Sequence, residues 1–504
     1  MHDIIFCSLP YSNLDHIYSA PAILKGVAVA NGFTAKTVDF GCELLNQCGR
    51  DTERFYRLQV YFISLKQGDE SYKKEIDKFY QNCIDFFRNN PSRYIGLSVL
   101  SIHTHRCVFE LCNSIKASGI DSQIVIGGRG AKVPAFSTVA AHFNLKSREK
   151  LLGFGDLLKN RGLADHVIIG DGEDAILELL QQDQVSDSVF VSEEFKSPIP
   201  DYQDYNFKDY LFADEPMLPV TGSKGCVRDC DFCDIKFQFG KYRYRSGADV
   251  ANELIEVYKK FGIRKFQFTD SLVNGGLKPF REFLEVLSRY NLENPDKRII
   301  WNGQYISRSY NEIPQDLYSL MRDSGAHGLT IGAESGSNRV LKAMNKKTTV
   351  EALLLELENF RQHDITCVLL TFVGHWSETW EDFVDHCRMF VKIAPYVRSG
   401  TISAVSLGIP YVLLDGTPSM FNHEINNIEI DENKNLLWIN RDNADNNLKE
   451  RLYRRLLVQQ ICKKLNIPTI SDIEHLLYLI DVVKNSHQEI NEFFQKFSRE
   501  PVLN

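Results

Sequence analysis

Long apolar runs are missing from this chain of 504 residues. No stretch approaches the roughly 18 consecutive apolar residues of a membrane span, and the first residues lack the basic segment and apolar core of a secretion signal. We therefore expect a cytoplasmic protein with no membrane partner. Its 12 cysteines are expected to be reduced thiols rather than disulfides, mostly as core filler.

An excess of positive charge is also missing. The 58 Lys and Arg residues are outnumbered by 66 Asp and Glu, which gives a net charge of −8. No global basic field draws the chain to nucleic acid, so nucleic acid is not a favoured partner. With 43% hydrophobic and 25% charged residues the composition is that of a globular protein, and the length predicts about two to four domains.

Near the middle of the chain, three cysteines lie without a fourth. Cys226, Cys230 and Cys233 follow the spacing Cys-x3-Cys-x2-Cys, and no other Cys or His lies between Phe207 and Arg264. A structural zinc site would need a fourth ligand, and iron–sulfur clusters normally take four thiolates. Three thiolates can hold a cubane 4Fe–4S cluster and leave one iron without a protein ligand. Zinc and three unrelated core cysteines are the alternatives, and the polar loop argues against the second.

With Phe232 before its last cysteine, this motif resembles the signature of the radical S-adenosylmethionine (radical SAM) enzymes. In that family the open iron chelates S-adenosylmethionine, and an electron from the cluster cleaves the sulfonium to give a 5′-deoxyadenosyl radical. The resemblance implies a 4Fe–4S cluster on the three cysteines, S-adenosylmethionine as cofactor, and an external electron donor of the flavodoxin or ferredoxin type.

Residues 218–415 alternate strand and helix in the order of a (β/α)6 partial TIM barrel, whose active residues lie at the carboxyl ends of strands. Residues 332–349, GAESGSNRVLKAMNKKTT, are similar to a block shared by methylthiotransferase-related and cobalamin-dependent radical SAM enzymes. This resemblance implies that Asp270 and Ser271 lie near the amino group of S-adenosylmethionine. It also implies that Glu334 and Ser335 lie near the ribose or methionine part, and Arg308 near the carboxylate. The alternatives are a surface Arg308 and helix-capping roles for Asp270 and for the segment that begins at Glu334.

Residues 374–379 read Gly-His-Trp-Ser-Glu-Thr, where the family usually has Gly-x-Pro-Gly-Glu-Thr. His375 and Trp376 are therefore local departures at the mouth of the expected barrel. We interpret them as a reflection of substrate shape.

Residues 1–190 carry apolar strands separated by helices, which predicts a Rossmann-like doubly wound parallel sheet. No Gly-x-Gly-x-x-Gly dinucleotide fingerprint is present. The segments IGLSVLS, IVIGG and IIGDGED resemble the N-terminal cobalamin-binding domain of one radical SAM subgroup. That resemblance implies cobalamin contacts from Ser98, Gly127, Gly128, Gly170, Gly172 and Glu173. The glycines alternatively serve only tight turns.

The cobalt-ligating Asp-x-His-x-x-Gly motif is absent, so a cobalamin would be held without a histidine ligand. His103 and His105 either face the corrin or are solvent-facing loop residues. Residues 50–92 read as a helical insertion, 191–217 as a linker and 416–504 as a mainly helical C-terminal cap. Within that cap, residues 448–465 predict an amphipathic helix whose basic face is solvated, and Ser471 and Glu474 predict a capping box that opens another helix.

The expected protein is therefore a three-part α/β enzyme that performs cobalamin-dependent methyl transfer to an unactivated centre of a small-molecule or peptide substrate. A radical rearrangement or cyclisation, with the N-terminal domain as scaffold, is one alternative. A non-catalytic iron–sulfur sensor or electron carrier is another, although such a protein would not need the residues that resemble an S-adenosylmethionine site. A tRNA methylthiotransferase would be expected to carry three further N-terminal cluster cysteines and a basic RNA-binding domain, which this sequence lacks. No catalytic residue is assigned.

Overall fold

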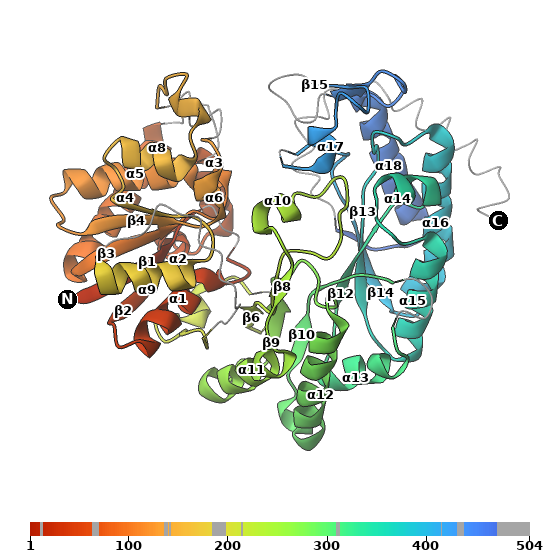
Figure 1. The fold of residues 1–504 in the computed structure, drawn as a ribbon, viewed down its shortest axis with the longest axis horizontal. Coiled ribbons are helices and arrows are strands. Elements are labelled where there is room, and N and C mark those ends of the chain that lie inside the picture. The colour runs from red at the N-terminus through yellow and green to blue at the C-terminus, as the bar shows by residue number, and fades with distance from the viewer. Residues whose placement is uncertain are drawn as a thin grey trace. The chain divides into compact units, whose positions relative to one another are not determined.

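The computed structural model of the chain divides into two compact units, Met1–Pro219 and Val220–Asn504 (Figure 1). It describes residues 1–10, 14–62, 70–135, 140, 143–183, 198–212, 215–308, 313–414, 416–430 and 438–470. The predicted capping box at Ser471 and Glu474 lies outside the described residues. Among the described residues, no helix combines the length and the apolar character needed to cross a membrane.

The first unit is built on a five-stranded sheet whose strands all run parallel. In the order β2-β1-β3-β4-β5, its strands are β2 (Ala35–Asp39), β1 (His2–Ser8), β3 (Ser92–Ser98), β4 (Gln123–Gly127) and β5 (His166–Ile168). Apolar residues on both faces, such as Ile4 on one face and its neighbour Ile5 on the other, are buried because helices cover the sheet. The order reverses between β1 and β3, which is where doubly wound sheets bind ligands at their carboxyl edge.

The helices of this unit join the strands and lie on the two faces of the sheet (Figure 1). They are α1 (Ser19–Ala30), α2 (Phe40–Gln47), α3 (Thr52–Tyr61), α4 (Glu70–Asn89), α5 (His105–Ala117), α6 (Arg129–Lys132), α8 (Phe154–Asn160) and α9 (Gly172–Gln182). Helices α3 and α4 lie within the segment 50–92, which the sequence predicts as a helical insertion. The ring of Phe40 packs edge-on against those of Phe79, Phe86 and Phe87, which attaches α4 to the rest of the unit.

The segment 198–212 also packs on the first unit. Asp204 accepts a hydrogen bond of 2.7 Å from the buried Lys25 ammonium. The Tyr210 hydroxyl donates to Asp39 Oδ2 at 2.9 Å. Residues 198–212 of the predicted linker are therefore attached to the first unit by polar contacts at Asp204 and Tyr210.

The second unit carries the partial barrel. One sheet has the order β10-β9-β6, and a parallel sheet has the order β11-β12-β13-β14-β17. These strands are β6 (Met217–Val220), β9 (Lys265–Phe268), β10 (Ile300–Asn302), β11 (Gln304–Tyr305), β12 (Leu329–Glu334), β13 (Cys367–Thr371), β14 (Ile402–Leu407) and β17 (Thr469–Ile470). The (β/α)6 pattern predicts a third strand at about residues 298–306, which is split into β10 and β11 at Gly303. The six predicted strands are therefore present, and β17 is an addition.

Helices cover the outside of this barrel (Figure 1). They are α11 (Gly247–Phe261), α12 (Leu277–Glu293), α13 (Asp316–Ser324), α14 (Asn338–Ala343), α15 (Val350–Gln362) and α16 (Trp380–Arg398). Each of α11, α12, α13, α15 and α16 buries an apolar stripe at helical spacing, as Phe280, Phe283 and Leu287 do on α12.

The C-terminal region contains more than helices. Helix α17 (Pro418–Phe421) precedes an antiparallel pair, β15 (Ile428–Ile430) and β16 (Trp438–Asn440), and α18 (Leu448–Lys464) leads to β17. The prediction that the basic face of α18 is solvated is wrong for Arg451, Arg454 and Arg455, which are at most 2% exposed. These arginines are buried because a carbonyl group of β16, a carboxylate of the barrel and a carbonyl group of the barrel accept their hydrogen bonds.

Candidate functional site

The three candidate cluster cysteines lie on residues 225–234, here called the cluster loop, between β7 (Ser223–Lys224) and α10 (Ile235–Phe239). Antiparallel pairing of β7 with β8 (Arg243–Tyr244) closes the base of this loop. Gly225 has φ +85°, and a Cβ there would lie 3.1 Å from the Lys241 carbonyl oxygen. The loop therefore needs a glycine where it begins.

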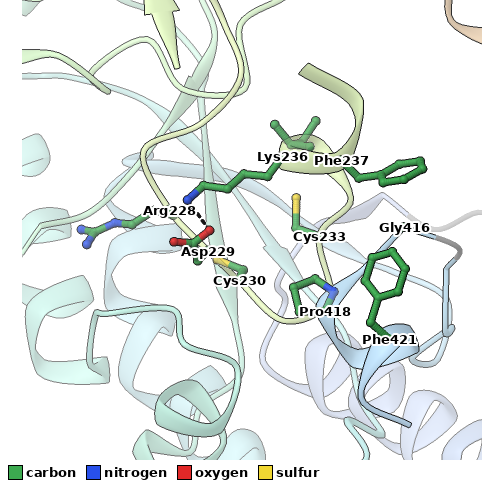
Figure 2. A pocket seen from close by; sticks show the side chains of 10 residues that line it. Arg228, Asp229, Cys230, Cys233, Lys236, Phe237, Gly416, Pro418 and Phe421 are labelled. Atoms are coloured by element: carbon green, nitrogen blue, oxygen red, sulfur yellow. Dashed lines mark ion pairs between the residues drawn. The ribbon is translucent and has the colours of Figure 1, made fainter. Parts of the chain in front are cut away.

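The structure brings the three thiols into one neighbourhood. Cys230 is buried, and Cys226 and Cys233 are half-buried. Burial raises the pKa of Cys230 to about 12; the ammonium of Lys346 opposes this rise, whereas Cys233, Glu334 and Cys226 add to it. These groups must therefore lie close enough to interact electrostatically. Cys230 and Cys233 also line a cavity of about 280 Å³ beside α10 and α17 (Figure 2).

No group of three or more His, Cys, Asp or Glu side chains converges on a single metal-ion position in the described part of the chain. A cubane cluster does not require such convergence, because each thiolate ligates a different iron. The donor set of three neighbouring thiols beside a cavity fits a 4Fe–4S cluster better than a single ion.

Backbone contacts fix the cluster loop within the second unit. Asp231 N donates to Met344 O at 3.0 Å, and Ser419 N donates to Asp231 O at 2.8 Å. Asn345 Nδ2 donates to Asp229 O at 2.8 Å. The loop is thus tied both to the end of α14 and to α17.

Asp270 holds the chain where it enters the cluster loop. Its two carboxyl oxygens accept hydrogen bonds from Gly222 N at 2.8 Å and Ser223 Oγ at 2.5 Å. Burial raises its pKa to about 7. Asp270 does not cap the next helix, since α12 begins at Leu277 after Gly276. Ser271 follows it in a half-buried position.

Glu334 ends β12 and forms an ion pair that the sequence did not predict. Its Oε1 accepts a hydrogen bond of 2.5 Å from Lys346 Nζ. Glu334 has φ +57°, a left-handed conformation that is uncommon for a residue other than glycine. A Cβ at Gly332 would collide with both charged groups, so that glycine leaves the space for the pair.

Lys346 brings a cation close to the cysteines. Burial alone would lower its pKa, but Glu334 and the thiol of Cys230 raise it above the ordinary value. Its Nζ lies 5.7 Å from the centroid of the Phe232 ring. Sequence reasoning missed Lys346 even though it lies in a quoted motif, because Lys346 and Lys347 are indistinguishable without their burial.

The remaining residues of this motif build the turn into α14. Ser335 Oγ accepts from Ser337 N at 3.2 Å, and Ser337 is the N-cap of α14 and donates to Asp382 Oδ1 at 2.6 Å. Gly336 N donates to His386 Nδ1 at 3.0 Å. The helix-capping alternative therefore applies to Ser337, not to Glu334.

Arg308 is half-buried and donates from Nη2 to Asn274 O at 2.7 Å and to Gly275 O at 3.0 Å. These contacts place it against the turn before α12. The cation that acts on the pKa of Cys230 is Lys346. An S-adenosylmethionine contact from Arg308 stays a prediction.

The interpretation given above relates His375 and Trp376 to substrate shape, whereas in the structure both side chains contact the cluster loop. His375 is fully buried, and both side chains bond to Asp231, between the second and third cysteines, at 2.9 and 3.0 Å. They contact the cluster loop because Asp231 offers a carboxylate that accepts two N–H groups.

In the first unit, the candidate cobalamin residues gather at the carboxyl edge of the sheet. Ser98 pairs in register with Gly127, which pairs with Ile168 at the end of β5. A Cβ at Gly128, φ +104°, would lie 2.6 Å from Val99 O, so this glycine is required by close backbone packing. Gly170 also has positive φ, and Gly172 and Glu173 form the first turn of α9.

At the same edge, Ser8 is the last residue of β1. Its hydroxyl is buried and has no hydrogen-bond partner among the described residues. A bound group with polar side chains would supply the missing partner, so this edge fits a ligand such as cobalamin. His105 is not a solvent-facing loop residue. It is buried, stacks on Phe154 at 3.9 Å and donates to Gly130 O at 2.8 Å.

Residues 220–390 match the Radical SAM superfamily model. Cytidylyl-2-hydroxyethylphosphonate methyltransferase of Streptomyces wedmorensis is 28% identical over 30% of this chain and 28% of its own length, so the similarity spans only part of each protein. Two solved structures share the fold over most of the chain. TsrM of Kitasatospora setae, a radical S-adenosylmethionine methyltransferase with cobalamin and a 4Fe–4S cluster bound, has a TM-score of 0.55, 15% identity and coverage of 83% of this chain and 77% of that one.

The second structure is OxsB, a cobalamin-dependent S-adenosylmethionine radical enzyme with aqua-cobalamin bound. It has a TM-score of 0.62, 12% identity and coverage of 98% of this chain and 71% of that one. The chain therefore contains a radical SAM domain, and it shares the fold of TsrM and OxsB over most of its length.

Proposed function

We propose that this protein methylates an unactivated centre of a small-molecule or peptide substrate, with S-adenosylmethionine, a 4Fe–4S cluster and cobalamin as cofactors. The observation that carries the proposal is the gathering of Cys226, Cys230 and Cys233 on one loop beside Lys346 and Glu334. Three thiolates leave one iron open, and the charged pair supplies partners for a ligand that carries both an ammonium and a carboxylate.

The protein's own contribution would be to hold and orient these groups. Cys226, Cys230 and Cys233 would ligate the cluster, whose electron would cleave S-adenosylmethionine reductively. Asp270 fixes the entry to the cluster loop, and Glu334, Ser335 and Arg308 are the proposed contacts to S-adenosylmethionine. Ser98, Gly127, Gly128, Gly170, Gly172 and Glu173 are the proposed contacts to cobalamin.

The N-terminal unit favours methyl transfer over other radical reactions. Its parallel sheet has the topology of a ligand-binding doubly wound domain, and Ser8 at its carboxyl edge lacks a partner among the described residues. TsrM and OxsB, which share this fold, both hold cobalamin in their solved structures. An electron donor of the flavodoxin or ferredoxin type is the proposed partner.

The first experiment tests the cobalamin. Full-length protein is purified anaerobically, reconstituted with iron, sulfide and hydroxocobalamin, desalted, and compared by visible spectroscopy with a cobalamin-free sample. Stoichiometric corrin absorbance over the broad cluster band is the expected result. A cluster without retained corrin would overturn the methyl-transfer proposal and leave rearrangement or cyclisation, with the first unit as scaffold.

The second experiment tests the radical SAM chemistry. Substituting Cys230→Ala should abolish the cluster and the release of 5′-deoxyadenosine from S-adenosylmethionine under a chemical reductant. Cys387→Ala is the matched control, since Cys387 is also a buried thiol of the second unit but lies on α16. Release of 5′-deoxyadenosine by the Cys230→Ala protein would refute the proposal.

A further inference from the structure

Between its second and third cysteines, the cluster loop carries the acidic side chain of Asp231. Asp231 Oδ2 accepts hydrogen bonds from His375 Nε2 at 2.9 Å and from Trp376 Nε1 at 3.0 Å. Its other oxygen, Oδ1, is buried and has no hydrogen-bond partner among the described residues. The two donors from 375 and 376 therefore provide all the side-chain hydrogen bonds that the structure describes for this carboxylate.

The orientation of the His375 ring follows from its neighbours. Ser377 N donates to His375 Nδ1 at 3.3 Å, so Nδ1 is the acceptor and Nε2 carries the proton given to Asp231. Tyr411 packs edge-on against the same ring at 5.0 Å. The ring is thus held from two sides and directed at the cluster loop.

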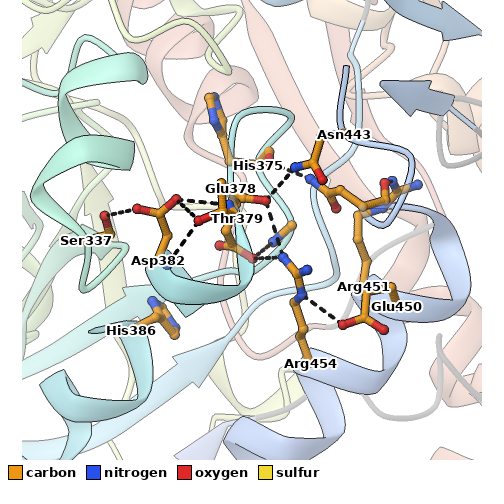
Figure 3. Close-up of polar contacts among 12 residues, drawn as sticks. Ser337, His375, Glu378, Thr379, Asp382, His386, Asn443, Glu450, Arg451 and Arg454 are labelled. Atoms are coloured by element: carbon orange, nitrogen blue, oxygen red, sulfur yellow. Dashed lines mark hydrogen bonds and ion pairs between the residues drawn. The ribbon is translucent and has the colours of Figure 1, made fainter. Parts of the chain in front are cut away.

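The turn that carries these two donors, residues 374–379, is fastened in turn by the C-terminal region (Figure 3). Asn446 Nδ2 donates to His375 O at 2.7 Å, and Asn440 Nδ2 donates to Trp376 O at 3.0 Å. Asn443 Nδ2 donates to Glu378 O at 2.9 Å. Three asparagine side chains from residues 440–446 therefore donate hydrogen bonds to three backbone carbonyl groups of this turn.

A buried ion pair completes the attachment. Glu378 Oε1 accepts from Gly374 N at 3.0 Å and from Arg454 Nη1 at 2.9 Å. Both charged side chains are at most 2% exposed. Because the ion pair connects the 374–379 turn to α18, a shift of that helix would also displace His375 and Trp376.

We infer that His375 and Trp376 are positioning residues for the cluster loop, and that the C-terminal segment 438–455 holds them in place. This inference rests on the proposed function only in naming a cluster as the ligand. It assigns an indirect role in cluster binding to the segment 438–455, which lies outside the matched domain of 220–390. Groups that bond near metal ligands commonly set ligand orientation and metal affinity.

The test compares His375→Leu, His375→Gln and Trp376→Phe in the full-length protein. Leucine removes the donor, whereas the Gln amide can replace Nε2 as a donor to Asp231. Asn291→Leu is the control, because Asn291 makes a buried pair of 2.9 Å hydrogen bonds with Ile299 and none with the cluster loop. The first readout is amide hydrogen exchange of residues 226–233 in cluster-free protein, where the Asp231 amide is bonded to Met344 O.

We expect exchange about tenfold faster in His375→Leu, a smaller rise in Trp376→Phe, and near wild-type exchange in His375→Gln and Asn291→Leu. After reconstitution, His375→Leu should retain less iron and sulfide and give an altered electron paramagnetic resonance spectrum, with recovery in His375→Gln. Wild-type exchange in both His375→Leu and Trp376→Phe would overturn the inference. Because the exchange measurement needs no cluster, its failure is distinct from a failure of the radical SAM proposal. If His375→Leu does not fold, Trp376→Phe alone decides.

Discussion

Lys346 places a positive charge beside the thiols of Cys230 and Cys233 and the carboxylate of Glu334. Its side chain is 12% exposed, and the ion pair with Glu334 at 2.5 Å compensates part of the cost of burying it. A cluster on Cys226, Cys230 and Cys233 gains negative charge when it is reduced. A nearby ammonium stabilises that reduced form, because cluster potentials depend on the surrounding charge.

We therefore predict that Lys346→Met lowers the reduction potential of the cluster. Lys346→Arg keeps the charge and should lower it less. Lys347→Met is the matched control, since Lys347 is the next residue and is exposed. The potential is measured by redox titration followed by electron paramagnetic resonance, and an equal shift in Lys346→Met and Lys347→Met would contradict a specific role for Lys346.

Glu356 on α15 predicts a pH dependence of stability. Its Oε1 accepts from Tyr305 at 2.7 Å and Tyr318 at 3.1 Å, and burial raises its pKa from the ordinary 4.5 to about 7. The folded protein therefore binds this proton more tightly than the unfolded chain does. Its stabilising effect is present below pH 4.5 and is lost as the pH rises toward 7.

Glu356→Gln keeps an acceptor for the tyrosines and cannot ionise. Relative to the wild type, its free energy of unfolding should rise by about 3 kcal/mol between pH 5 and pH 8. Urea unfolding of both proteins at the two pH values measures this difference. A constant difference across that range would show that Glu356 does not titrate as described.

Among the elements, α18 departs furthest from its sequence pattern. Four cations in residues 448–456 suggest a solvated face, yet Arg451, Arg454 and Arg455 are buried. Besides Glu450 and Gln459 on the same helix, their partners are the carbonyl oxygens of residues 438, 446, 407 and 408 and the carboxylate of Glu378, all outside α18. Helical periodicity cannot distinguish a buried arginine from a solvated one when the acceptors come from distant parts of the chain.

Arg454→Met should destabilise the second unit by about 3 kcal/mol, because it leaves the Glu378 carboxylate buried without its cation. Adding Glu378→Gln should recover part of that loss. Lys463→Met, on an exposed position of the same helix, should change stability by less than about 0.5 kcal/mol. Chemical denaturation of the wild type, both single variants of the pair, the double variant and Lys463→Met measures these changes, and an additive double variant would argue against the ion pair.

Strands of the first unit's sheet were predictable because their apolar runs are continuous and end in glycine or polar residues, as at residues 94–101 and 123–128. Strand β17 was not, since its two residues carry no periodicity and acquire their structure by pairing with Val405 and Ser406. The cluster loop was readable from spacing alone. The side chains that surround it, Lys346, His375 and Trp376, come from other elements and needed the fold.

For the whole molecule, burial divides the thiols into two classes. Ten of the twelve cysteines are buried, and Cys226 and Cys233 are half-buried. The chain therefore places its accessible thiols at the candidate cluster site, as expected for a protein whose other cysteines fill its cores.

In cluster-free native protein, a maleimide should label Cys226 and Cys233 first. Cys230 should follow slowly, because burial raises its pKa to about 12 and leaves little thiolate. The other nine should react only after unfolding. Mass spectrometry of digested samples over time measures this order, and rapid labelling of Cys7 or Cys462 would contradict the described packing of the unit concerned.

The position of β17 at the edge of the β11-β12-β13-β14-β17 sheet has a consequence for biosynthesis. The cluster loop leaves the ribosome long before the strand and helix that complete the second unit. Domains generally fold as units during translation, so the first unit can fold while the barrel still lacks α18 and β17. Given the inference that segment 438–455 holds the partners of the cluster loop, we expect a cluster on Cys226, Cys230 and Cys233 to assemble after synthesis of residues 438–470.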